Sequence, residues 1–270
     1  MKTIRTIKKA FKQTPLSEKF IPSGLTNNNY IVQTPTQKVV VRLPKPGNEA
    51  LFNYAHEAIV LKMIADADLD APTLYFDEKS GVKVSAYIDD AHVYNNSHIR
   101  DAARLIRRLH DLDVLSGESF DILAKYEMYK KRISTPLYNL EPYEDFIRHV
   151  AISSAPHTLC HNDLVQGNLL FTPDRAYLID YEYAMDNDPF FDIMSFLTEN
   201  DIQDPSLRET FYLAYFGETP TTAQRKRLHT FELAHHVLWC AWAQMMYNTH
   251  GDTIYYDIAT LKYTRLLEAL

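Results

Sequence analysis

The sequence predicts an α+β protein with a small antiparallel sheet first and a longer, mostly helical part after it. Residues 29–33 and 38–43 are rich in apolar and β-branched residues, and the Thr-Pro-Thr-Gln turn between them indicates a hairpin. From residue 205 onward, apolar residues recur with helical spacing. We therefore expect an N-terminal lobe at residues 1–89 and a C-terminal lobe at residues 90–270.

The bulk composition is that of a globular protein. The chain has 270 residues, enough for two lobes with substantial cores, and 46% of them are hydrophobic. No apolar run is long enough to span a membrane, and the basic N-terminal segment lacks the apolar core of a secretory signal. Because Ile4, Ile7 and Phe11 share a helical face, this segment is expected to dock on the protein body as a helix, with an anionic membrane as the alternative. We expect a cytoplasmic protein without stable membrane insertion.

Charge and cysteine content narrow the class of partner. A net charge of −7 gives no electrostatic reason to expect nucleic-acid binding, and it is compatible with a cationic small molecule. The chain has two cysteines, Cys160 and Cys240, too few for a disulfide framework or a thiolate metal site. Both are expected to be small buried residues.

The first lobe continues beyond its hairpin. Residues 22–28 precede the hairpin and contain short polar residues and one glycine, which suits a turn or a loop that covers phosphates with backbone N–H groups. Apolar spacing predicts a helix over residues 50–65. Two further strands are expected at residues 73–76 and 82–88, the second of which would run into an inter-lobe hinge.

Two polar residues of the first lobe are candidates for a functional pair. Arg42 lies in a β-branched strand, and its planar guanidinium could bridge phosphate oxygens and a carboxylate. Glu57 lies within the predicted helix and is the expected partner. At the expected hinge, backbone groups of Tyr87 and Ile88 could hydrogen-bond a nucleotide base.

The second lobe should be built mainly from helices. Asp188 and Pro189 offer an N-cap followed by proline at the first helical position. Apolar spacing and such end signals predict helices at residues 96–112, 121–133, 143–153, 190–199, 205–216, 223–247 and 253–270.

The segment between residues 159 and 199 concentrates the polar residues that suit catalysis. Short apolar pieces flank His161, Asp163 and Asn168, and a hairpin would then lead to Asp180. This spacing matches the catalytic loop of kinases. Asp163 would accept the proton of an attacking hydroxyl, Asn168 and Asp180 would hold Mg²⁺, and His161 would support the loop by hydrogen bonds.

Three motifs in this segment, HNDLVQGNLL, LIDYEYA and NDPFFDI, resemble those of the choline/ethanolamine kinases within the wider aminoglycoside-phosphotransferase-like kinases. The resemblance implies a two-lobed protein-kinase-like fold and an enzyme that uses ATP and Mg²⁺. It also implies the same roles for Asp163, Asn168 and Asp180. Asp192 resembles the family's structural aspartate that braces the catalytic loop.

The resemblance also implies a substrate site for a small cationic alcohol. Glu199 aligns with an acidic position that contacts the substrate cation, and Trp239 and Trp242 match a similarly spaced tryptophan pair in the choline pocket. An indole face suits a quaternary ammonium, which cannot donate hydrogen bonds. A tyrosine that the family places soon after the acidic residue is absent here.

Choline or a similar amino alcohol is therefore the expected substrate. Ethanolamine, thiamine, another small alcohol and an aminoglycoside are the alternatives among enzymes. A nucleotide-binding module without catalysis is the alternative outside them.

Overall fold

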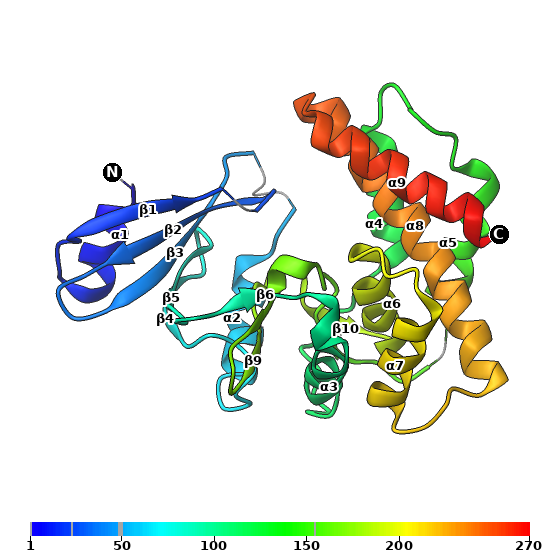
Figure 1. Ribbon diagram of the computed structural model, residues 1–270. Coiled ribbons are helices and arrows are strands. Elements are labelled where there is room, and N and C mark those ends of the chain that lie inside the picture. Colours follow the sequence, from blue (N-terminus) through cyan, green and yellow to red (C-terminus); the bar gives the residue numbers. More distant parts are fainter. Residues whose placement is uncertain (1, 23, 48–50, 154) are drawn as a thin grey trace.

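The computed structural model describes residues 2–22, 24–47, 51–153 and 155–270 of the chain (Figure 1). A five-stranded antiparallel sheet fills the N-terminal part in the order β1-β2-β3-β5-β4. Its strands are β1 (Ser17–Ile21), β2 (Asn27–Gln33), β3 (Lys38–Pro44), β4 (Thr73–Asp77) and β5 (Val82–Ala86). The predicted hairpin is β2 and β3, so this prediction is confirmed.

Helix α1 (Lys2–Phe11) lies against this sheet, as expected for the amphipathic segment (Figure 1). Ile7 is fully buried in a small core with Val32, Val39, Val41, Leu43 and Val84. Ile4 stays exposed, so only part of the apolar face contacts the body.

Helix α2 (Tyr54–Met63) follows the sheet's third strand and begins later than predicted. The Asn53 side chain caps it by accepting a hydrogen bond from the backbone N–H of His56. An asparagine in this position satisfies a backbone N–H that has no partner within the helix. Residues 48–50, included in the predicted helix, lie outside the described residues.

The C-terminal part is mostly helical, which confirms the predicted α+β class. The predicted helices form within a few residues of their expected bounds. They are α3 (Ile99–His110), α4 (Ile122–Arg132), α5 (Glu144–Ala151), α6 (Pro189–Glu199), α7 (Pro205–Phe216), α8 (Thr222–His250) and α9 (Thr253–Ala269).

Two small sheets place the catalytic segment between the sheet and the helices. β7 (Thr158–Cys160) pairs with β10 (Met185–Asn187), and β6 (His92–Val93) pairs with β8 (Leu169–Phe171), which pairs with β9 (Ala176–Leu178). The loop of residues 161–168 therefore starts at one small sheet and ends at the other. The predicted return hairpin is β8 and β9.

Two smaller expectations concern the cysteines and membrane insertion. Cys160 and Cys240 are both buried and free, as predicted. None of the described helices is both long enough and apolar enough to cross a membrane.

Candidate active site

The catalytic-loop segment is shaped by a buried carboxylate on α6. Asp192 Oδ2 accepts a hydrogen bond from the backbone N–H of His161, and Oδ1 accepts one from Asn162, each at 2.7 Å. Asn162 has a left-handed backbone with φ of 64°, a conformation that asparagine tolerates better than most residues. Charge-assisted hydrogen bonds to a fully buried carboxylate are strong, so Asp192 fixes the start of the loop.

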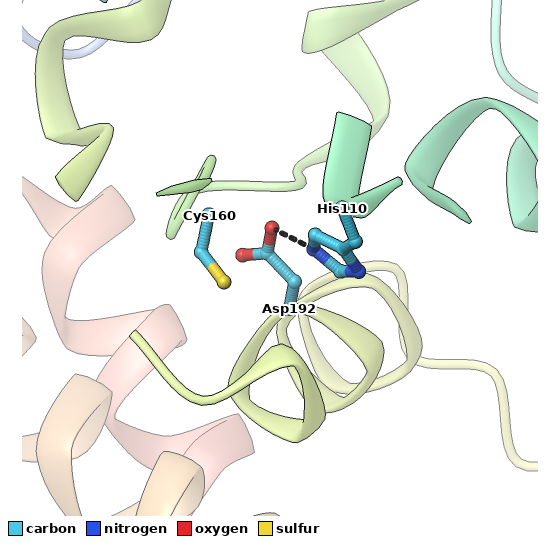
Figure 2. Close-up of side chains that lie close together, drawn as sticks. All are labelled: His110, Cys160 and Asp192. Atoms are coloured by element: carbon cyan, nitrogen blue, oxygen red, sulfur yellow. Dashed lines mark hydrogen bonds and ion pairs between the residues drawn. The ribbon is translucent and has the colours of Figure 1, made fainter. Parts of the chain in front are cut away.

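Figure 2 shows that His110 and Cys160 lie beside the same carboxylate. Their potential ligand atoms and those of Asp192 lie within 4.8 Å of one another. His110 Nε2 lies 3.0 Å from Asp192 Oδ2, and burial raises the pKa of the Cys160 thiol well above its usual value. Both oxygens of Asp192 already accept backbone hydrogen bonds from the loop, so the cluster supports the loop structure.

Asp163 and Asn168 lie within hydrogen-bond distance of each other. Asn168 Nδ2 donates to the backbone oxygen of Asp163 at 2.9 Å and to its Oδ2 at 3.2 Å. Burial raises the pKa of Asp163 to about 7, and the negative charges of Glu199 and Asp180 add to the shift. A carboxylate with a pKa near neutrality is suited to accept a proton.

His161 supports the same region from within the core. Its Nε2 lies 3.0 Å from the backbone oxygen of Ile179, the residue before Asp180. Burial lowers the pKa of His161, so the ring is neutral at physiological pH. The predicted supporting hydrogen bond therefore joins the loop to the end of the return hairpin.

Arg42 connects the sheet, α2 and the catalytic segment. Its Nη2 lies 2.7 Å from Glu57 Oε2, and its Nη1 lies 2.6 Å from Asp180 Oδ1. Burial alone would lower the pKa of Arg42, but the carboxylates of Glu57 and Asp180 raise it well above its ordinary value. Asp180 has a left-handed backbone with φ of 70° at the point where the chain leaves β9.

Glu182 is a site residue that we did not select from the sequence. Its Oε1 accepts a hydrogen bond from Thr26 at 2.7 Å, and its Oε2 accepts one from Asn27 at 2.8 Å. Burial raises its pKa to about 8, with a further contribution from the charge of Asp180. The signal in the sequence is a single acidic residue between the two tyrosines at positions 181 and 183.

Glu199 also has a partner that the sequence did not indicate. Lys262, on α9, is buried and donates to Glu199 Oε1 at 2.7 Å and to the backbone oxygen of Thr198 at 2.9 Å. A lysine buried in this way is normally paired, and here its ion pair fixes the end of α6.

Trp239 and Trp242 pack edge to face, with ring centroids 6.0 Å apart. Tyr183 packs against Trp239 at 6.1 Å and Tyr255 against Trp242 at 5.7 Å, so four aromatic rings form a row. Trp239 Nε1 donates to His235 Nδ1 at 3.1 Å. Tyr183 and Tyr255 were not predicted as neighbours of the tryptophans, because both lie outside α8 in the chain.

The predicted hinge follows the last strand of the five-stranded sheet. β5 ends at Ala86, so Tyr87 and Ile88 lie just beyond it and are partly exposed. Tyr87 N–H donates to the backbone oxygen of Lys38 at 3.2 Å, and Lys38 Nζ lies 3.8 Å from the Tyr87 ring centroid.

The donor atoms near Asp163 fit a divalent cation that prefers oxygen. Asn168 donates hydrogen bonds through its amide nitrogen within the loop, and Asp180 accepts one from Arg42 at Oδ1. Within the described part of the chain, the other oxygens, Asn168 Oδ1 and Asp180 Oδ2, accept no hydrogen bond. Carboxylate and amide oxygens are ligands that Mg²⁺ prefers. The residues present therefore suit Mg²⁺.

A separate hollow of about 800 Å³ lies between α2 and β4. Its walls include Ala58, Leu61, Tyr75 and Phe76. Neither Asp163 nor Asp180 lines it, so it is not part of the candidate site.

Comparison with known proteins places the chain among phosphotransferases. The model of the phosphotransferase enzyme family (APH) matches residues 17–228. Protein LicA of Haemophilus influenzae is 27% identical over 251 residues, covering 85% of this chain and 73% of that protein. A probable ethanolamine kinase of Arabidopsis thaliana is 25% identical over 268 residues, covering 83% of this chain and 71% of that protein.

Solved structures share the fold. The crystal structure of choline kinase LicA from Streptococcus pneumoniae has a TM-score of 0.84 at 24% identity and covers 98% of both chains. A structure of LicA in complex with AMP has a TM-score of 0.83 at 23% identity, covering 99% of this chain and 98% of that one.

Proposed function

Since the chain belongs to the phosphotransferase enzyme family, we propose that it transfers the γ-phosphoryl group of ATP to the hydroxyl of choline or a similar amino alcohol. The observation that carries the proposal is the group of Asp163, Asn168 and Asp180, whose side chains combine one base and two oxygen ligands within one loop and hairpin. The relatives named LicA and probable ethanolamine kinase support this class of acceptor.

The proposed reaction follows from the position and pKa of Asp163. The substrate oxygen attacks the γ-phosphorus, its proton passes to the Asp163 carboxylate, and the bond between the γ-phosphorus and the bridging oxygen breaks to release ADP. Asn168 and Asp180 would hold Mg²⁺, which when bound neutralises charge on the phosphates. Asp192 and His161 would keep the loop in its reactive shape.

Nucleotide binding is proposed at the junction of the two lobes. Arg42, fixed by Glu57, would contact phosphate oxygens, and the backbone of Tyr87 and Ile88 would hydrogen-bond the base. The related LicA structure that contains AMP supports a nucleotide site in this fold. We also propose that the boundary between the lobes lies near residue 89, shortly after β5 ends at Ala86.

The aromatic row is proposed to bind the cationic end of the substrate. Trp239 and Trp242 would present ring faces to an ammonium group, and Glu199 would add negative charge. Its ion pair with Lys262 offsets part of that charge, so the aromatic rings are expected to contribute most of the recognition.

Replacing Trp242 with leucine tests the aromatic site. We expect KM for choline to rise about 30-fold, because a desolvated cation–π contact contributes about 2 kcal/mol. For 3,3-dimethylbutanol, the uncharged analogue of choline, we expect a change of less than about threefold, since no cation–π contact is lost. Trp242→Phe is the matched control, because it keeps a smaller ring. An equal loss for both substrates would contradict the assignment.

The pKa of Asp163 predicts the pH dependence of the reaction. Burial raises this pKa to about 7, so the fraction of ionised base grows as pH rises through 7. We expect kcat/KM to increase about tenfold per pH unit below 7 and to level off above it. A profile of kcat/KM between pH 5.5 and 8.5 at saturating ATP and magnesium measures this. A flat profile down to pH 5.5 would show that Asp163 is not the titrating base.

Parallel assays of ADP formation identify the acceptor. We expect turnover with choline to exceed turnover with ethanolamine, thiamine and kanamycin at equal concentration. If only ethanolamine were turned over, the phosphotransfer mechanism would stand and the substrate would be ethanolamine in place of choline. ATP binding without turnover of any alcohol would favour the module that lacks catalysis.

A further inference from the structure

Two histidines outside the candidate active site bring their ring nitrogens into contact. His92 Nε2 and His98 Nε2 lie 2.9 Å apart. His92 belongs to β6, which pairs with β8, and His98 ends the short helix η1 (Asn96–His98) before α3. Both backbone segments are therefore held by regular hydrogen bonds.

The rings themselves are also held. His98 stacks on Phe171, with ring centroids 4.4 Å apart and planes at 19°. Its other ring nitrogen, Nδ1, faces Asp101 Oδ2 at 3.8 Å. This distance is longer than that of a hydrogen bond, so Asp101 adds a negative charge near the ring without fixing its orientation.

The separation of the two nitrogens indicates which metals fit. Typical bonds from a metal to an imidazole nitrogen are about 2.0–2.1 Å, so a metal bound by both nitrogens would subtend an angle of about 90°. Such an angle is that of neighbouring ligands in square-planar, tetragonal or octahedral geometry, whereas a tetrahedral site would need the nitrogens about 3.3 Å apart. Square-planar and tetragonal sites with nitrogen ligands are typical of Cu²⁺ and Ni²⁺.

We propose that His92 and His98 form a two-histidine site for Cu²⁺ or Ni²⁺. His92 is exposed, so water can occupy the remaining coordination positions. The site differs in metal preference from the oxygen ligands of the catalytic loop, because two imidazole nitrogens suit transition metals and not Mg²⁺.

A bound metal would link β6 to the start of α3 next to the catalytic loop. Gln166, within that loop, donates to the backbone oxygen of Tyr94 at 2.9 Å, and Tyr94 N–H donates to Leu169 at 3.0 Å. A bound metal would therefore stabilise β6 and Tyr94 after it, on which the end of the catalytic loop rests.

Isothermal titration of the full chain with NiCl₂ and with CuCl₂ tests the site, without a polyhistidine tag and without nucleotide. We expect one ion per chain, with Cu²⁺ bound more tightly than Ni²⁺ and Zn²⁺. His92→Gln should weaken binding at least tenfold, and Asp101→Asn, which removes a nearby negative charge, should weaken it less than His92→Gln does. His157→Gln, at an exposed histidine elsewhere, is the matched control and should bind as the wild type does.

His98→Phe keeps an aromatic ring against Phe171 and removes both ring nitrogens, with their contacts to His92 and Asp101. Its unfolding temperature in EDTA should equal that of the wild type, while NiCl₂ should raise the unfolding temperature of the wild type alone. Should this variant fail to fold, the exposed His92→Gln variant decides the question. Equal metal affinity in His92→Gln and wild type would overturn the proposal.

Discussion

Replacing Asp163 with asparagine is expected to lower kcat by about three orders of magnitude, within the range that general-base groups contribute. Asparagine keeps the size of the side chain and can still accept the hydrogen bond from Asn168, but it cannot take a proton. ATP affinity should stay within about threefold of the wild type, because Asp163 is proposed to contact the acceptor hydroxyl. Single-turnover kinetics and equilibrium nucleotide titration measure the two effects separately.

The same variant should be more stable than the wild type at neutral and alkaline pH. The pKa of Asp163 is about 7 in the folded protein and about 3.9 in an unfolded chain. The folded state therefore holds the proton more tightly, and the wild type loses stability as pH rises from about 4 to 7. We expect the gap in unfolding temperature to widen over that range. If Asp163→Asn retained a tenth of wild-type kcat, Asp163 would not be the base. Asp145→Asn, at an exposed aspartate, is the control.

Replacing Arg42 with methionine should reduce the free energy of unfolding by about 3–5 kcal/mol. The change leaves Glu57 fully buried without its ion pair, and Asp180 loses its hydrogen bond at Oδ1. Urea denaturation at pH 7.5 measures the loss. Arg104→Met, at an exposed arginine of α3, is the matched control and should change stability by less than about 0.5 kcal/mol.

A second substitution separates the ion pair from the packing of Arg42. In the double variant Arg42→Met and Glu57→Leu, the unpaired carboxylate is gone, so we expect part of the stability to return. Activity should not return, because no guanidinium remains for the phosphates. A double variant as unstable as the single one would show that the buried charge is not the cause.

Helices with clear end signals were predicted closely from the sequence. Helix α7 has the predicted bounds, because Asp204 caps its start and Gly217 ends it in a left-handed conformation. Strands β6 and β10 were not predicted, since His-Val and Met-Asp-Asn contain no run of apolar or β-branched residues, unlike the equally short β8 and β9. Each forms because a strand distant in the chain offers hydrogen bonds.

In the candidate site, too, contacts between residues close in the chain were predicted and contacts between distant residues were not. The short contact between Asp163 and Asn168 follows from spacing within one loop. The partners of Glu182 and Glu199 do not, because Asn27 and Lys262 reach these carboxylates from segments far away in the chain. Such contacts depend on how the whole sheet and α9 pack, which local patterns do not encode.

Asp192 is synthesised after the loop that its hydrogen bonds stabilise. The carboxylate that accepts the backbone hydrogen bond of Asn162 belongs to a residue 30 positions later in the chain. During synthesis on the ribosome, the segment that carries Asp163 therefore emerges before its support exists. We expect a nascent chain that stops short of α6 to lack the reactive loop conformation, even though every proposed catalytic side chain has already been added.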